Sequence, residues 1–295
     1  MLLKLMPFCL GSIMFAMGLG LQRNDFTRLI RQPRVVSGLL AGQILGLPLL
    51  AIAIILILKL PAMLALGLLL IALCPGGVTS NLFCQLSRGD TALSVSLTAL
   101  SSLIGVFSLP ILLQFGFSAF SMGDTKFELS LWLTIKQLIT ITLLPMIIGM
   151  TLSTYHPWFH QQGQILASRC SSLFFAIIVL LLWHQQWPSI QTGALSIGSA
   201  VIMLNIGAIG LALLLNKAIN LKGRQAITSY YEIGLQNAAL AFFVAFNILH
   251  EPQLATATTV YSVVMTISAA ILLTLLRLSN KKAPTDGETS TQAVK

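Results

Sequence analysis

Apolar residues fill this chain in long runs that are separated by short segments rich in charged, Gly and Pro residues. A helix that crosses a membrane needs about 20 consecutive, mostly apolar residues. The runs therefore predict an all-α polytopic membrane protein with nine transmembrane helices, at about residues 5–21, 35–58, 62–88, 91–114, 129–150, 169–187, 190–215, 226–249 and 254–276. We expect residues 1–278 to form a single transmembrane unit.

Two of these runs are interrupted at their polar centres. The third contains CPGGVTSN at residues 74–81, and the eighth contains YEIGLQN at residues 231–237. Inside hydrocarbon each backbone N–H and C=O group needs a hydrogen-bond partner, so non-helical backbone survives there only where it lines a cavity or holds a ligand. Two such interruptions in the two halves of one chain are typical of secondary transporters.

The order of the interrupted runs also predicts an internal repeat. They are the third and the eighth, and an odd offset of five spans gives the two units opposite orientations in the membrane. Spans 1 to 4 are then expected to match spans 6 to 9 as inverted repeats, with the fifth span unmatched. Residues 279–295 are rich in Thr, Ser and charged residues, so we expect a short disordered cytoplasmic tail there.

The composition excludes a soluble globular protein, because 56% of the residues are hydrophobic and only 8% are charged. A net charge of +9 would suggest nucleic-acid binding in a soluble protein. Here the cations cluster in the loops between apolar runs, which is what membrane orientation requires, so we predict no nucleic-acid partner.

The cations are distributed very unequally over alternate loops. Lys4, Lys59 and Lys126 fall on one side, and thirteen Lys and Arg residues fall on the other: Arg23, Arg28, Arg31, Arg34, Arg88, Arg169, Lys217, Lys222, Arg224, Arg277, Lys281, Lys282 and Lys295. The positive-inside rule then places the N-terminus outside and the C-terminus in the cytoplasm. No organellar targeting segment is visible, so we expect the inner (cytoplasmic) membrane of a bacterium.

Glu232 is the only acidic residue well inside an apolar run. A lone carboxylate at mid-membrane costs about 2.5–3.5 kcal/mol on insertion scales, so it should be protonated or matched by a cation. Gln236 follows on the same helical face, and a helix break at Gly234 would free the carbonyls of Ile233 and Leu235. Such oxygen ligands suit a hard cation. Na⁺ is the first expectation and a proton is the second.

The other interruption offers further oxygen atoms. Pro75 and the two glycines after it stop the helix, and Thr79, Ser80 and Asn81 follow directly. Ser94 and Thr98, four residues apart, stack on one face of the next span. Ser, Thr and Asn commonly form hydrogen bonds between membrane helices, so structural roles are also open. Beside an unpaired Glu232 and two helix breaks, we favour a cation site.

These motifs resemble the bile acid:sodium symporter family. The resemblance rests on MFAMGL at residues 14–19, CPGGVTSN, RGDTALSVSLTALSSLIGVF at 88–107 and EIGLQNAALA at 232–241, in the family's order and spacing. It implies two sodium ions. The first would be bound by Ser80, Asn81, Ser94, Thr98 and Glu232, and the second by Gln43, Glu232, Gln236 and the carbonyls of Ile233 and Leu235.

The resemblance also implies a core domain that holds two crossing discontinuous helices, and a smaller panel domain, with elevator-like or rocking alternation between them. The core would comprise parts of about 35–114 and 190–276, and the panel parts of about 1–34 and 129–215. This chain starts one helix later than many bacterial members, as the nine-span animal members do. The missing helix belongs to the panel and would be the partner of the fifth span.

For the substrate, the family implies an organic anion such as a bile acid, a sulfated steroid, pyruvate or pantoate. Thr79, Asn237 and Thr266 are the expected contacts. Thr266 stands where some bile-acid-binding members have Asn, and Val78 replaces a frequent Thr. No Arg lies inside the membrane to bind a carboxylate in bidentate fashion, so we expect a small monocarboxylate such as pantoate or a 2-keto acid.

Three other functional classes are weighed against sodium symport. A proton-coupled organic anion transporter would use Glu232 as the proton carrier. An intramembrane enzyme would need a nucleophile beside a base, but the deep spans offer no His next to a Ser or Cys and no second acid, so we predict no enzyme. A passive channel or sensor would fail to accumulate solute against a gradient.

Overall fold

The computed structural model describes residues 2–120, 129–156 and 158–282. Within these residues all regular structure is helical, apart from one isolated β-bridge. The first half comprises α1 (Leu2–Gly20), α2 (Arg23–Arg31), α3 (Pro33–Ala41), η1 (Gly42–Gly46), α4 (Leu47–Leu58), α5 (Ala62–Leu73), α6 (Val78–Leu86) and α7 (Thr91–Phe120). The second comprises α8 (Leu131–Leu138), η2 (Ile139–Leu143), α9 (Leu144–Tyr155), η3 (Phe159–Gly163), α10 (Gln164–Ala218), α11 (Gly223–Gly234), α12 (Ala238–Phe243), η4 (Val244–Ile248), η5 (Pro252–Leu254) and α13 (Ala255–Lys282).

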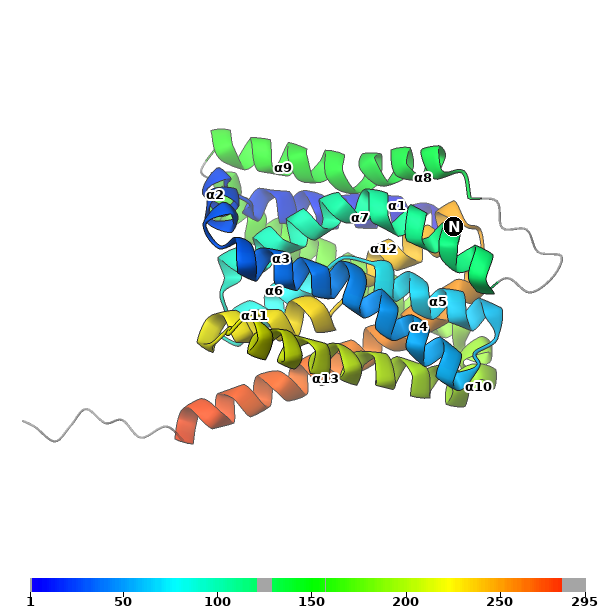
Figure 1. The fold of residues 1–295 in the computed structure, drawn as a ribbon. Helices are drawn as coiled ribbons and strands as arrows, with labels where there is room; N and C mark the ends of the chain where they lie inside the picture. The colour runs from blue at the N-terminus through cyan, green and yellow to red at the C-terminus, as the bar shows by residue number, and fades with distance from the viewer. Residues whose placement is uncertain (1, 121–128, 157, 283–295) are drawn as a thin grey trace, which may run out of the picture.

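Most helices run along one common direction, as a bundle that crosses a bilayer must (Figure 1). Six helical segments of the described chain are long and apolar enough to span a membrane: Pro33–Leu58, Thr91–Phe120, Leu131–Tyr155, Gln164–Leu181, Ile197–Ala218 and Pro252–Leu278. A seventh span is possible if α1 and α2, which are bent by 73°, count as one. The multi-pass, all-helical class is thus confirmed, whereas the count of nine and the inverted repeats stay predictions.

Two predicted boundaries differ from the structure. The spans expected at 169–187 and 190–215 belong to one helical element, α10, with no helix end between them. The last helix continues to Lys282, four residues into the segment expected as a disordered tail, and the rest of that segment lies outside the described residues. The extension of α13 follows from helix-compatible residues, whereas α10 continues through Pro188 and Gly193, which local propensity disfavours inside a helix.

The two interrupted runs are each split into two short helices. Between α5 and α6, Cys74 and Gly77 have extended backbone, and between α11 and α12 Leu235 does. The first break contains Pro75 and two glycines and the second follows Gly234, and these residue types interrupt or weaken a helix. Figure 1 shows the break between α11 and α12 beside that between α5 and α6, near the middle of the bundle.

Helix α10 packs on two sets of helices, which also meet each other through α1 with α12 and through α7 with α8. One set contains α1 and α9, where Gly18 and Gly149 allow such close contact that a Cβ atom on either would come within 3 Å of the facing backbone. Small residues permit this approach between membrane helices. In the other set α10 packs on α4, α11 and α13. There the Ser229 hydroxyl of α11 donates to Asn216 of α10 at 2.7 Å.

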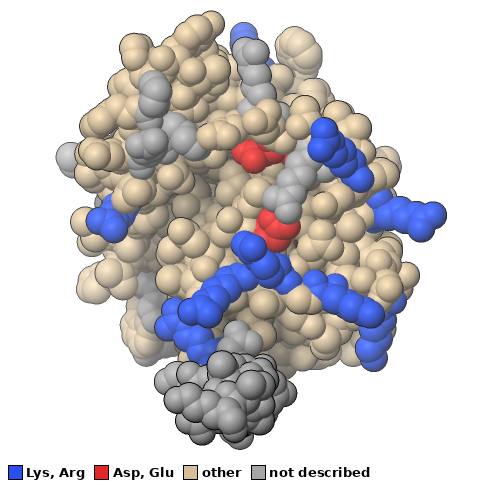
Figure 2. Space-filling view, turned by 90° about the vertical axis from the view of Figure 1, so that its left-hand side faces the viewer, with Lys and Arg blue, Asp and Glu red and all other residues tan. Residues whose placement is uncertain are grey.

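Many of the Lys and Arg residues that the sequence assigns to one side of the membrane lie at one end of the molecule. Figure 2 views this end, with Lys and Arg side chains spread across it. It is the end at which α6, α10 and α13 finish and α11 begins, whereas α1 starts at the opposite end (Figure 1). We call it the basic end. Its exposed cations include Arg31, Arg34, Arg88, Lys217, Lys222, Arg224 and Arg277.

Candidate ion and substrate site

The two breaks are joined directly by their backbones. Gly76 and Gln236 form an antiparallel bridge, and the Asn237 N–H donates to the Pro75 carbonyl at 2.8 Å. These bonds satisfy backbone groups that the broken helices leave without an intrahelical partner. The crossing therefore holds the ends of α5 and α11, and the starts of α6 and α12, in one place.

Glu232 lies beside this crossing and is only 1% exposed. Three hydroxyls from two other helices lie within hydrogen-bond distance of its carboxylate. Ser80 (2.8 Å) and Ser94 (2.6 Å) reach Oε1, and Thr98 (2.8 Å) reaches Oε2. Asn81 joins the same cluster, because its Oδ1 lies 2.7 Å from the Ser94 hydroxyl. The structure thus brings together all five side chains expected at the first ion site.

This cluster contains more acceptor oxygens than protons. Ser80 Oγ lies near two acceptors, the Glu232 carboxylate and the Gly77 carbonyl (2.7 Å). Ser94 and Thr98 each lie near both Glu232 and Asn81. A hydroxyl has a single proton and can satisfy only one acceptor at a time. A buried group of oxygens with too few protons is a suitable environment for a hard cation.

The residues expected at the second ion site lie close to the backbone of α11 at Glu232 and Ile233. Gln43 donates through Nε2 to the Glu232 carbonyl at 3.1 Å, and Gln236 donates to the Ile233 carbonyl at 2.8 Å. Gln236 is 1% exposed, yet its Oε1 is a buried acceptor with no partner within the described residues. Leu235 has extended backbone, as a break there requires. An orphaned buried acceptor of this kind fits a cation ligand.

Two residues that the sequence analysis did not single out hold the end of α11. Asn205 of α10 (3.2 Å) and Tyr261 of α13 (3.0 Å) both donate to the Gly234 carbonyl. Both side chains are at most 1% exposed. By occupying this carbonyl they fix the backbone orientation at the break. An isolated Asn inside an apolar run was the available signal for Asn205, because a buried amide needs partners.

A cavity of about 470 Å³ lies next to the crossing. Its lining residues come from five elements: Ile13 of α1; Val78, Thr79 and Leu82 of α6 with the preceding Gly77; Ser172, Phe175, Ala176, Val179 and Leu180 of α10; Gln236, Asn237, Ala238 and Ala239 at the second break; and Ser262, Val263, Met265, Thr266 and Ile267 of α13. Most of this surface is apolar, and none of these residues is charged. The volume lies within the range of small-molecule sites.

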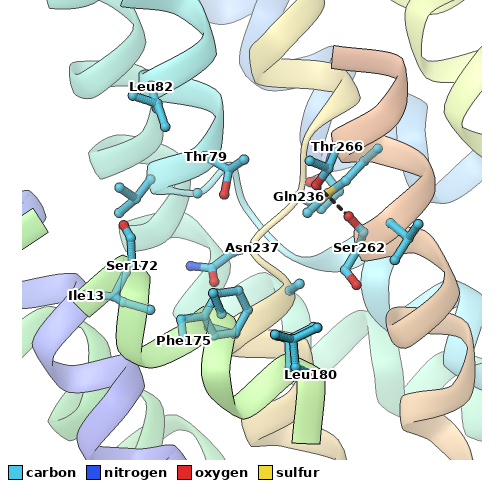
Figure 3. A pocket seen from close by; sticks show the side chains of 18 of the residues that line it. Ile13, Thr79, Leu82, Ser172, Phe175, Leu180, Gln236, Asn237, Ser262 and Thr266 are labelled. Carbon is cyan, nitrogen blue, oxygen red and sulfur yellow. Dashed lines mark hydrogen bonds between the residues drawn. The ribbon is translucent and has the colours of Figure 1, made fainter. Parts of the chain in front are cut away.

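Asn237 presents an amide donor to this cavity. Its Oδ1 caps α12 by accepting from the Leu240 N–H at 3.0 Å, so its Nδ2 is the atom left for other partners. That nitrogen is buried and has no partner within the described residues, and the side chain is 4% exposed. Figure 3 shows Asn237 in the cavity, with the Thr79 hydroxyl pointing toward it. Both are therefore placed to donate to an acceptor group on a ligand.

Thr266 has a different environment from the other two expected substrate contacts. It lines the cavity, but it is exposed, and its hydroxyl donates to the Ser262 carbonyl of its own helix at 2.7 Å (Figure 3). Its single proton is therefore already used. Thr266 can accept a hydrogen bond from a ligand, whereas Thr79 and Asn237 are better placed to donate to an anion.

A multi-pass helical membrane protein whose two interrupted helices cross at a buried oxygen cluster has the architecture of a secondary transporter. Comparison with known proteins gives the family. Residues 7–192 match the family described as the Sodium Bile acid symporter family. The chain belongs to this family, and the predicted resemblance is confirmed.

Several curated relatives match nearly the whole chain. One is the rice (Oryza sativa subsp. japonica) protein described as "Probable sodium/metabolite cotransporter BASS2, chloroplastic", 31% identical over 91% of this chain and 62% of its own length. The Bacillus subtilis "Uncharacterized sodium-dependent transporter YocS" is 30% identical over 95% of this chain and 85% of its own length. The human "Hepatic sodium/bile acid cotransporter" is 26% identical over 84% of this chain and 71% of its own length. The chain thus spans less than two thirds of the rice relative.

Proposed function

We propose that this protein is a sodium-coupled symporter that moves a small organic anion across a membrane by alternating access. The observation that carries the proposal is the proton-poor oxygen cluster around Glu232 at the crossing of the two breaks. Family membership supports the same function, because relatives are described as sodium/metabolite and sodium/bile acid cotransporters. We place the protein in a bacterial inner membrane, with the N-terminus outside and the C-terminus cytoplasmic.

Two sodium ions would bind on either side of Glu232. The first takes the side-chain oxygens of Ser80, Asn81, Ser94, Thr98 and Glu232, and the second takes Gln43, Glu232, Gln236 and the carbonyls of Ile233 and Leu235. The fit is supported by the surplus acceptors at the first site and the orphaned Gln236 Oε1 at the second. Both ions would also bind the two broken helices together.

The binding of Na⁺ and the binding of the substrate anion would be coupled through charge. One carboxylate between two Na⁺ ions leaves a local charge of about +1, and the N-terminus of α6 adds a positive dipole end. A substrate anion at Thr79 and Asn237 is then attracted only when the ions are bound, which is a coupling free energy between the sites. The two sets of helices that pack on α10 would correspond to the panel and the core, and would move relative to one another.

The test of this function is uptake into proteoliposomes under an imposed Na⁺ gradient, without a pH gradient. Sodium symport predicts that the anion accumulates inside against its own gradient only when Na⁺ is present outside. The alternative is a proton-coupled transporter, which the hydroxyl shell around Glu232 would also serve by stabilising a carboxyl that loses and regains its proton. It predicts uptake driven by a pH gradient in K⁺ buffer, and that result would replace the sodium proposal.

The substrate contact is tested by Asn237→Ser. Serine keeps an oxygen that can cap α12 but lacks the amide donor that faces the cavity. We expect anion uptake to fall by about tenfold or more, as for a lost hydrogen bond to a charged group. Na⁺-dependent thermal stabilisation should be retained. Competition by 2-keto acids, pantoate and taurocholate then tests the substrate class, and competition by taurocholate alone would contradict a small monocarboxylate.

The role of the two hydrogen bonds from Asn205 and Tyr261 to the Gly234 carbonyl is tested by Tyr261→Phe. The variant removes one of two donors to the Gly234 carbonyl and leaves Asn205 in place, so the protein should fold with a free energy of unfolding lower by about 1 kcal/mol. We expect the Na⁺ concentration for half-maximal stabilisation to rise by about two- to tenfold. Tyr230→Phe, at a half-buried tyrosine of the same helix as Glu232, is the control. An equal shift in both variants would rule out a specific role for Tyr261.

A further inference from the structure

A groove of about 580 Å³ lies between the C-terminal part of α10 and the adjoining η1 and α4. Helices α4 and α10 lie side by side in Figure 1. The groove is lined by Gly46, Leu50, Gly207, Gly210, Leu211, Leu213, Leu214 and Lys217. Its surface is apolar except at Lys217, and its outer leucines, Leu213 and Leu214, are 45% and 65% exposed.

Glycines keep this groove open. Gly207, Gly210 and Lys217 follow one another at helical spacing on the same face of α10, together with Leu214. A Cβ atom at Gly210 would have no atom within 4 Å beyond the backbone of its own helix, so there is room at this position for a group from outside the helix. At Gly207 the facing Leu50 closes the floor of the groove, because its side chain lies 2.7 Å from the position of a Cβ atom.

The length and the charge of the groove suit one particular kind of occupant. From Gly207 to Lys217 the helix rises about 15 Å, at 1.5 Å per residue. This is half of the roughly 30 Å hydrocarbon core, which is the depth of one leaflet. Lys217 is exposed one residue before the end of α10, at the basic end of the molecule. The groove is therefore apolar over one leaflet and cationic where lipid headgroups begin.

We infer that this groove binds an acyl chain of an anionic phospholipid, with the lipid phosphate at Lys217. The lipid belongs to the leaflet at the basic end. An acyl chain supplies apolar contacts to the leucines and fills the space above Gly210, while the ammonium group of Lys217 attracts the negative headgroup. None of the residues that line the groove is an expected ion ligand, and the inference does not depend on the proposed transport function.

A second copy of the chain fits the groove less well. A two-fold dimer in a membrane has its axis along the membrane normal, so each residue meets its counterpart at the same depth. Pairing through this face would bring two Lys217 side chains to the same level near the contact, where like charges repel each other. A free phospholipid brings the opposite charge instead.

Native mass spectrometry of the full-length protein in detergent tests the inference, with dioleoyl phosphatidylglycerol and dioleoyl phosphatidylcholine as probes. We expect wild type to retain phosphatidylglycerol preferentially. Lys217→Gln should reduce that preference by about fivefold, the effect of one cation at a membrane surface. Gly210→Leu should fill the groove and reduce retention of both lipids. Inorganic phosphate should not compete, because the headgroup alone lacks the apolar contacts.

The chain provides a matched control for each variant. Gly198→Leu makes the same change on α10 outside the groove, at another glycine with open space around its Cβ position. Lys222→Gln removes another exposed cation of the basic end. Equal losses in Lys217→Gln and Lys222→Gln would indicate a diffuse basic surface and overturn the site. Dissociation of a dimer by Gly210→Leu would identify a second copy as the occupant and overturn it too. If Gly210→Leu does not fold, Gly210→Ala and the two lysine variants decide the question.

Discussion

Glu232→Gln is expected to abolish Na⁺-dependent thermal stabilisation and Na⁺-driven uptake. The carboxylate is the only charge among the expected ligands of both ions, and glutamine replaces it with a neutral amide of the same shape. For wild type, Na⁺ at 100 times its dissociation constant should stabilise the folded state by about 2.7 kcal/mol through mass action. The variant should lose this gain.

The measurement is the melting temperature of detergent-purified protein in Na⁺, K⁺ and choline at matched ionic strength. In Na⁺-free buffer we expect the variant to be at least as stable as wild type, because it removes a buried group that prefers a counter-ion. Glu251→Gln is the matched control, since Glu251 lies in the loop before η5, outside the site. A Na⁺-selective rise that persists in Glu232→Gln would exclude Glu232 as the central ligand. No difference between cations for wild type would favour proton coupling.

Gly76→Ala is expected to have an effect of similar size, by crowding the ion sites. A Cβ atom on Gly76 would lie 3.0 Å from Glu232 Oε2, 3.3 Å from Thr98 Oγ1 and 3.4 Å from Gln43 Nε2. The added methyl group would therefore lie among ligands of both sites and displace at least one of them. We expect no Na⁺-driven uptake and at least a tenfold weaker response of the melting temperature to Na⁺.

The control for Gly76→Ala is Gly198→Ala, where the added methyl group meets no atom within 4 Å. In the control both uptake and Na⁺ response should equal those of wild type. The fold of the Gly76 variant is checked by its melting temperature in K⁺, where no ion is expected at the site. Wild-type Na⁺ affinity in Gly76→Ala would show that the cations bind away from the crossing.

Local chemistry made the helix breaks predictable. Pro75 and its following glycines cannot sustain a helix, and Glu232 with Gly234 marks a polar interruption, so both positions could be found without any knowledge of distant contacts. The apolar runs likewise predicted most continuous spans, because a membrane requires a minimum length of apolar helix. The uninterrupted course of α10 was not predictable, because its polar middle resembles a loop between two spans.

Residue types alone indicated an oxygen-rich cation site near Glu232, but Gln43 and the division of the ligands into two sodium sites depended on the family resemblance. Ser80 and Ser94 lie 152 and 138 residues from Glu232 along the chain, and Gln43 lies 189 residues away. No local rule relates positions so far apart. The hydrogen bonds from Asn205 and Tyr261 to the Gly234 carbonyl were not predicted for the same reason, since nothing near either residue in the sequence indicates which carbonyl accepts its proton.

The sequence by itself determined that this is a multi-pass helical membrane protein with two broken helices, an isolated Glu232 and one cationic side. These properties depend on the hydrogen bonding of backbone groups and on the solvation of side chains, which act on each segment separately. Only the tertiary structure decided that the breaks cross at Gly76 and Gln236, that Asn237 faces an apolar cavity closed by α1 and α10, and that Gly210 borders an open groove. Those features arise where side chains from distant segments pack together, and packing is a property of the assembled helices.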